Sequence, residues 1–237
     1  MINTIEAAAV SYMEKAGLSY NPPELYVSVD VARAKRIARE YEIMLHRPNA
    51  PDVAEAYSKM IEETVGQYKE ALEFGLHVEF ITGEDPYTTG PREALADIVD
   101  NNHLWVLSTR DGFGSNDRFD PLDNPLLQET EFTISGRVAL VNDLFRVIHD
   151  YFGHAKEGHG FRANGEENAW RSHSAMFSPL ARKAMTTETR GQNSWVNFGP
   201  FGETNRNAKT ADTIFADQKT GLLPDWVVTE GAGVDYE

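Results

Sequence analysis

The sequence predicts a mostly α-helical protein of the α+β class, with a helical bundle core and a small sheet of short strands. Two observations support this fold class. Apolar residues recur at steps of three and four over several long segments, which is the spacing of amphipathic helices. Alternation of apolar and polar residues is confined to short runs, which is the pattern of strands. The 237 residues are enough to bury a sizeable core, and we expect a single domain over 1–237.

The N-terminal part, 1–75, should be helical. A first helix should end at Gly17, and a second should begin after a capping residue, Ser28 or Asp30. The most regular amphipathic pattern covers 51–75, where a proline takes the favoured first position and a glycine follows the last turn.

Residues 76–135 form a small α/β insertion in this prediction. Runs 77–82 and 103–107 read as strands separated by a short helix. His103 is then interpreted as the first residue of a strand, not as a metal ligand. Segment 110–128 is rich in Gly, Asp, Asn and Pro and should be a long loop.

The helical part at 136–218 holds most of the candidate functional residues. A helix should run over 137–156, and its apolar residues surround much of its circumference, so it should be central. This helix contains His149, Asp150 and His154, whose burial is costly unless their polar atoms find partners. Either a metal ion or a network of hydrogen bonds to carboxylates would provide them.

A second helix, over 166–178, should supply further ligands. Glu166 and His173 are seven residues apart and share one face, whereas Glu167 lies on a neighbouring row beside Trp170. We favour Glu167 over Glu166 as the carboxylate that faces the first helix. The two helices would then present one set of ligands to a single point: His149, Asp150, His154, Glu167 and His173. Without thiolates, such a set suits iron, manganese or zinc.

The run 186–200 is polar with embedded aromatic residues, which is typical of a substrate-binding loop; a structural loop packed under the core is the alternative. Glu188, within this run, is the candidate general base. Six residues are candidates for holding an anionic substrate: Arg162, Arg171, Arg190, Gln192, Asn193 and Trp195. Beyond them, a short helix should begin at Asp212 and a last strand should cover 222–228.

Charge and composition restrict the classes of function. The net charge of −15 argues against nonspecific binding of duplex DNA, which requires phosphate neutralisation. Nine basic and six acidic residues nevertheless give 146–209 a charge of +3 against −18 for the rest. These arginines either contact an anion or pair with acids on a solvated surface. No cysteine is present, which excludes cysteine nucleophiles and thiolate sites. A signal peptide pattern and long apolar runs are also missing, so we expect a cytoplasmic protein without a membrane span.

Two family resemblances arise from the motifs of this region. HDYFGHA, EENAWR and TTETRGQNSW are similar to motifs of an uncharacterised bacterial and phage-associated family, which implies no particular function. Segment 147–154 resembles the His-Asp doublet helix of HD-domain phosphohydrolases, in which the doublet binds a divalent metal that activates water. That resemblance implies His149 and Asp150 as ligands and Asp212 as a distal aspartate, although the upstream histidine of that family has no counterpart here. The His and carboxylate spacings are also similar to those of helical di-iron oxidases.

Three hypotheses follow from the sequence. The first is a metal-dependent hydrolase of a phosphorylated or otherwise anionic small molecule, in which the metal lowers the pKa of bound water. The second is a non-haem iron or di-iron oxygenase or oxidase. The third is a non-catalytic interaction protein whose histidines and acids form a satisfied polar core.

Overall fold

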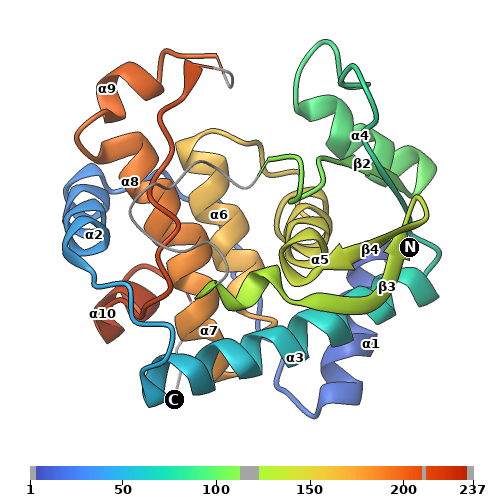
Figure 1. The fold of residues 1–237 in the computed structure, drawn as a ribbon, viewed down its shortest axis with the longest axis horizontal. Coiled ribbons are helices and arrows are strands. Elements are labelled where there is room, and N and C mark those ends of the chain that lie inside the picture. Colours follow the sequence, from blue (N-terminus) through green and yellow to red (C-terminus); the bar gives the residue numbers. More distant parts are fainter. Residues whose placement is uncertain (1–3, 113–122, 210–211, 234–237) are drawn as a thin grey trace.

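Helices account for most of the structure, and they enclose two small sheets (Figure 1). The computed structural model describes residues 4–112, 123–209 and 212–233. Over these residues the predicted α+β class is confirmed, since each sheet has only two strands. None of the helices in the described ranges has the length and apolar character needed to cross a bilayer.

Three helices form the N-terminal part, as the sequence predicts: α1 (Thr4–Ala16), α2 (Val31–Ile43) and α3 (Pro51–Glu73). Asp30 caps α2, because its Oδ1 atom accepts a hydrogen bond from Arg33 N at 3.0 Å. Gly17 and Gly75 follow α1 and α3 with φ angles of 65° and 88°. Glycine adopts this left-handed conformation without steric cost, and it therefore ends both helices.

The predicted strands of the insertion pair with each other. The unit consists of β1 (His77–Phe80), α4 (Arg92–Asn101) and β2 (His103–Val106). β1 and β2 are parallel, and His77 lies opposite His103. Of the predicted loop at 110–128, residues 113–122 lie outside the described ranges, and its end forms a short 3-10 helix, η2 (Pro125–Leu127).

The prediction of one helix over 137–156 was wrong at its start. Residues 137–140 instead form β4 (Arg137–Leu140), which pairs antiparallel with β3 (Glu129–Ile134), and the helix α5 (Val141–Ile148) begins only afterwards. Ser135 and Gly136 join the strands with φ angles of 49° and 77°. Positive φ at both central residues is the geometry of a tight hairpin turn. A short apolar run fits a strand as well as a helix, so periodicity alone did not separate them.

The C-terminal half is a succession of helical segments: the π-helix η3 (His149–Ala155), α6 (Ala163–Ser174), α7 (Pro179–Thr186), the π-helix η4 (Thr187–Gly191), α8 (Gln192–Phe198), α9 (Gly202–Asn205) and α10 (Asp225–Thr229). The predicted polar loop at 186–200 is thus mostly helical. The Thr189 hydroxyl donates to the Met185 carbonyl oxygen at 2.7 Å, so this polar side chain is satisfied inside the helix.

Two further predictions near the C-terminus were wrong. The helix expected from Asp212 onward is not formed, since 213–224 has neither helix nor strand. In place of the strand expected at 222–228, residues 225–228 belong to α10 and 222–224 have no regular structure. Pro224 precedes this helix, and its carbonyl oxygen accepts a hydrogen bond from Val227 N at 2.8 Å. A turn of helix satisfies its backbone locally, whereas a strand at this place would need a partner.

The packing of α6 against η3 positions the candidate site. α3 lies along α5 and α7, and the main apolar core between them includes Tyr57, Met60, Ile148 and Trp170. In Figure 1, α3 crosses below α5, α6 and α7. A smaller apolar cluster joins α2, α8 and α10. The main core therefore surrounds the helical segments that contain the predicted ligands.

Candidate metal centre

His149 and His154 face the same side of η3 because this helix is widened. Lys156 N bonds to Tyr151 O at 3.1 Å, and His159 N bonds to the His154 carbonyl oxygen at 2.9 Å, so each bond spans five residues. Residues five apart differ by about 140° on an α-helix, but they are close to one full turn apart on a π-helix. The two imidazole rings are accordingly 5.0 Å apart. On an ordinary α-helix, Asp150 and His154, four residues apart, would share a face instead.

Glu166 brings a carboxylate to these two rings. Its Oε2 atom lies 3.5 Å from His154 Nε2 and 3.9 Å from His149 Nε2. The first turn of α6 passes so close to the preceding loop that a Cβ atom on Gly165 would lie 1.6 Å from the Gly160 oxygen. Position 165, next to the candidate ligand Glu166, therefore requires glycine. Metal bonds of 2.0–2.2 Å place tetrahedral ligands about 3.3–3.6 Å apart. The 3.5 Å contact with His154 lies within this range, and the 3.9 Å contact with His149 is slightly longer.

His154 has the tautomer that a metal ligand needs. Its Nδ1 atom lies 3.0 Å from the His159 carbonyl oxygen. Because a carbonyl oxygen only accepts, Nδ1 bears the hydrogen of this bond. In the neutral imidazole, Nε2 then has a free lone pair, and this atom is the one that faces Glu166. Such a hydrogen bond from the other ring nitrogen is typical of histidines that bind metals.

A chain of hydrogen bonds gives His149 the same tautomer. Gln67 Nε2 donates to the Met176 carbonyl oxygen at 3.3 Å, which leaves Gln67 Oε1 as the acceptor for His173 Nε2 at 2.8 Å. His173 Nδ1 must then accept, and its partner at 3.1 Å is His149 Nδ1. His149 therefore donates through Nδ1, and its Nε2 lone pair faces Glu166. His173 orients a ligand and does not join the three ligand atoms.

Electrostatics favour a cation at this site. Burial would raise the pKa of Glu166, but His154 and His149 hold it well below its usual range, so the carboxylate is ionised. Burial lowers the pKa of His154, but Glu166, Asp150 and the His159 backbone together more than offset this effect, so the net shift is upward. Burial lowers the pKa of His173 well below its ordinary value and keeps this ring neutral.

Asp150 lies near the three ligand atoms without belonging to them. Its carboxyl group is half-buried, and burial raises its pKa above the ordinary value. It also interacts electrostatically with His154, His149 and Glu166. In the described part of the chain, the group of ligand atoms that lie within 4.8 Å of one another at this place is His149, His154 and Glu166.

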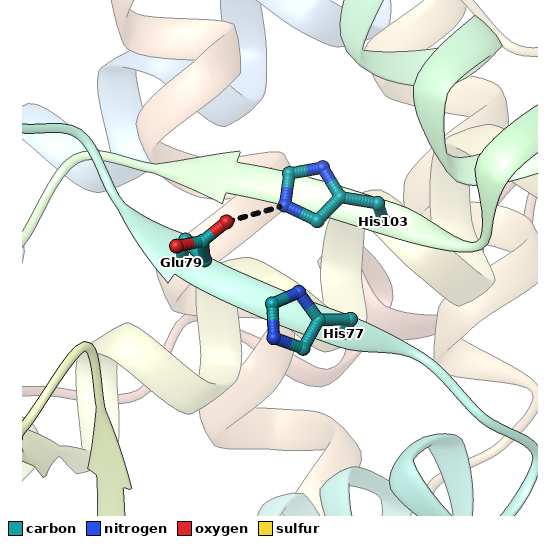
Figure 2. A group of neighbouring side chains, drawn as sticks. All are labelled: His77, Glu79 and His103. Atoms are coloured by element: carbon teal, nitrogen blue, oxygen red, sulfur yellow. Dashed lines mark hydrogen bonds and ion pairs between the residues drawn. The ribbon is translucent and has the colours of Figure 1, made fainter.

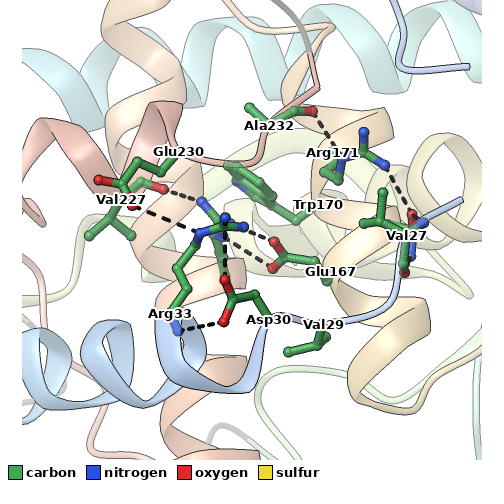
Figure 3. Close-up of polar contacts among 12 residues, drawn as sticks. Val27, Val29, Asp30, Arg33, Glu167, Trp170, Arg171, Val227, Glu230 and Ala232 are labelled. Carbon is green, nitrogen blue, oxygen red and sulfur yellow. Dashed lines mark hydrogen bonds and ion pairs between the residues drawn. The ribbon is translucent and has the colours of Figure 1, made fainter. Parts of the chain in front are cut away.

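Glu167, which the sequence analysis favoured as a ligand, pairs with Arg190 instead. Arg190 Nε donates to Glu167 Oε2 at 3.1 Å, and its guanidinium lies 3.8 Å from the centre of the Trp170 ring. Figure 3 shows Glu167 beside Trp170, in the network that joins α6 to the Val227 backbone. Adjacent residues on an α-helix point about 100° apart, so Glu166 and Glu167 cannot face the same partner, and Glu166 faces the histidines.

The other arginines have different surroundings. Arg171 is buried and donates to the carbonyl oxygens of Leu25 and Ala232 at 2.6 and 3.0 Å, which ties α6 to two distant segments. Figure 3 shows the bond to Ala232. Arg171 and Arg190 are thus held by the protein itself. Arg162, the residue that precedes α6, is exposed and accessible to a ligand.

Glu188, the predicted general base, sits in a separate polar group. Its carboxylate accepts hydrogen bonds from the Tyr57 hydroxyl and from Gln192 Nε2, the latter at 2.7 Å. Burial raises the pKa of Glu188 to about 7, although these two hydrogen bonds oppose the shift. Nearby, the Trp195 indole donates to Glu42, while Asn193 accepts from Asn197. In the described ranges, these hydrogen bonds link Glu188, Gln192, Asn193 and Trp195 to residues other than the histidines.

A small pocket of about 10 Å³ lies beside Glu166. Its apolar lining residues are Val29, Ala34, Ala163 and Phe198, and its polar ones are Glu166, Glu167, Arg190, Asn193, Ser194 and Asn197. A separate cavity of about 210 Å³ lies among Tyr26, His159 and Arg171. Of the candidates for substrate binding, Arg190 and Asn193 line the small pocket that Glu166 also lines.

Fold and site together define a helical α+β protein with a candidate centre of two histidines and one glutamate. Comparisons with protein-family models, curated proteins and solved structures gave no match. The resemblances to HD-domain phosphohydrolases, to di-iron oxidases and to a phage-associated family therefore stay predictions. Asp212, the distal aspartate implied by the first resemblance, is exposed and is not among the clustered ligands of the described residues.

Replacing Arg190 should test whether this residue is structural. We expect Arg190→Ala to lower the free energy of unfolding by about 3–5 kcal/mol, because Glu167 would keep a charge in a largely buried place without its partner. Arg162→Ala is the matched control and should change stability by less than about 0.5 kcal/mol, since Arg162 is exposed. Urea unfolding measures both. An Arg190→Ala protein as stable as the control would contradict the structural role.

The contribution of Glu188 to the free energy of unfolding should decrease as pH rises. Its folded pKa of about 7 exceeds the ordinary value of 4.5, so the native state retains a proton that the unfolded chain loses between these values. The contribution is fully present below pH 4.5 and lost as pH rises through 7. Glu188→Gln has no such proton, so its stability relative to wild type should increase by about 3 kcal/mol from pH 4.5 to pH 8. Urea unfolding at both pH values measures this difference, and a constant difference would refute it.

Proposed function

We propose that this protein is a metal-dependent hydrolase that acts on a phosphorylated or otherwise anionic small molecule. A divalent transition metal, iron, manganese or zinc, would be held by His149, His154 and Glu166. The single observation that supports this most strongly is the convergence of the His149 and His154 Nε2 atoms on the ionised Glu166 carboxylate, while both Nδ1 atoms are already held by hydrogen bonds. Two imidazoles and a carboxylate are also a ligand set found in zinc hydrolases.

The residues around the ligands fit this chemistry. A bound metal of this kind lowers the pKa of a coordinated water molecule. Asp150 would accept the proton, since its raised pKa lies nearer to neutrality and it interacts electrostatically with all three ligands. It takes the role that the sequence analysis assigned to Glu188. His173 and the His159 backbone would hold the two imidazoles in their binding orientations.

The surface around the small pocket beside Glu166 is the proposed place of substrate contact. Asn193 and Asn197 supply amide groups there, and Phe198 supplies apolar area. Arg162 lies just ahead of α6 with an exposed guanidinium, which suits contact with an anion. We expect the enzyme to work in the cytoplasm and to bind neither duplex DNA nor a membrane.

A mononuclear non-haem iron oxygenase is the second candidate. Two histidines and one carboxylate with open positions are the ligand set of that class. Asp150 favours the hydrolase, because hydrolysis requires a proton acceptor beside the activated water. A di-iron centre is disfavoured, since the ligand group formed here by the described residues contains one carboxylate.

Metal analysis should test the centre. Wild-type protein purified without a chelating tag should retain close to one ion per chain at this site in mass spectrometry. The double variant His149→Ala/His154→Ala should lose it, because two of three ligands are gone. The matched control, Glu84→Gln/Asp85→Asn, changes two exposed residues and should keep it. Equal metal content in this control and in His149→Ala/His154→Ala would overturn the proposal and favour a satisfied polar core.

Activity assays should then separate the candidate reactions. We expect the metal-loaded protein to hydrolyse members of a phosphoester panel. Asp150→Asn should keep the metal but lose about 100-fold or more in kcat, as for removal of a general base. Asp85→Asn, at an exposed position, is the control and should be fully active. Oxygen consumption by the iron-loaded protein without hydrolysis would instead support the oxygenase.

A further inference from the structure

A second group of metal-ligating side chains lies on the parallel sheet. His77 on β1 and His103 on β2 are register partners, and their rings are stacked 5.4 Å apart. Glu79 is two residues beyond His77, so it points to the same face of the sheet. Its Oε2 atom lies 3.3 Å from His103 Nε2. Figure 2 shows the three side chains together on this face of β1 and β2.

The spacing of the three side chains suits a metal ion. One ligand atom from each of His77, Glu79 and His103 lies within 4.8 Å of the other two. The 3.3 Å contact between Glu79 and His103 matches the edge of a tetrahedron with metal bonds of about 2.0 Å. His77 is exposed and the other two are half-buried. A bound ion would therefore have coordination positions open to water.

Asp97 fixes the orientation of His103. Its Oδ2 atom lies 2.6 Å from His103 Nδ1, and a carboxylate can only accept, so Nδ1 bears the hydrogen. Asp97 is itself held by the Tyr87 hydroxyl at 2.9 Å and by Asn101 Nδ2 at 2.8 Å. His103 Nε2 is thereby directed at Glu79. A carboxylate behind a histidine is a recurrent support for metal ligands.

His77 distinguishes a metal site from a plain ion pair. The two ring nitrogens of His103 already have Asp97 and Glu79 as partners without any ion. That arrangement needs no further residue. For the His77 side chain, the described residues provide no hydrogen bond or ion pair, only the stacked His103 ring. Its imidazole adds nothing to an ion pair, but it completes a set of three ligands around a metal.

We infer that His77, Glu79 and His103 bind one divalent transition metal ion of the zinc class, with Asp97 as a positioning residue. Two imidazoles and a carboxylate without thiolate favour zinc, nickel or copper over calcium or magnesium. The ion joins β1, through His77 and Glu79, to the adjacent strand β2, through His103. A two-stranded sheet is marginally stable by itself, so an ion that joins its strands strengthens this edge of the fold. This inference is independent of the proposed hydrolase.

The experiment uses the full chain with the substitutions His149→Ala and His154→Ala as the host protein. The site at Glu166 then cannot bind the metal and does not contribute to the titration. Titration with Co²⁺ alone, followed by visible absorption, should give one ion per chain, and Zn²⁺ should displace it. His77→Ala and Glu79→Gln in this host should each weaken Co²⁺ binding about 100-fold. Asp97→Asn should weaken it about 10- to 100-fold, and the exposed control Glu84→Gln should leave it unchanged.

Three results would overturn the inference or part of it. No Co²⁺ binding by the folded host overturns the site. Unchanged affinity in His77→Ala shows that the bound ion does not use His77, which overturns the three-residue site. Unchanged affinity in Asp97→Asn removes its positioning role. Thermal melting without metal checks that each variant is folded. If the host does not fold, the same titration of wild type against His77→Ala should show one bound ion fewer in the variant.

Discussion

Buried polar atoms must find partners, and this constraint organises the centre of the molecule. η3 takes two imidazoles into the core, where an unpaired nitrogen would cost free energy. Widening into a π-helix turns His149 and His154 to one side. Their Nδ1 atoms are then satisfied by His173 and by a backbone carbonyl, and their Nε2 atoms converge on Glu166. Local departures from the α-helix are frequent at functional sites.

The same constraint accounts for the arginines of this region. The Arg190 guanidinium stacks on Trp170 and donates hydrogen bonds to the Glu167 carboxylate and the Val227 carbonyl oxygen. Arg171 donates to two carbonyl oxygens from distant segments. An excess of positive charge along a stretch of sequence therefore does not define a surface that attracts anions. Here part of that charge joins α6 to the rest of the fold, and Arg162 is the arginine near α6 that stays exposed.

The two candidate metal groups arise in different ways. Glu166 reaches the histidines only because α6 packs against η3, so that site depends on the core. His77 and His103 meet through the register of two adjacent strands, and Asp97 joins them from the helix between. A change in core packing would disturb the first group, whereas the second depends on one small βαβ unit near the surface.

The sequence by itself determined the mostly helical fold, the N-terminal helices, both strands of the parallel sheet and the His-rich segment that contains two of the clustered ligands. Capping residues, glycines and apolar periodicity act locally, so they can be read from neighbouring residues. Only the tertiary structure decided that η3 is widened, that Glu166 rather than Glu167 faces the histidines, and that 186–200 is helical. It also paired His77 with His103. These features depend on which segments pack together, because a side chain's direction and partners are set by neighbours distant in sequence.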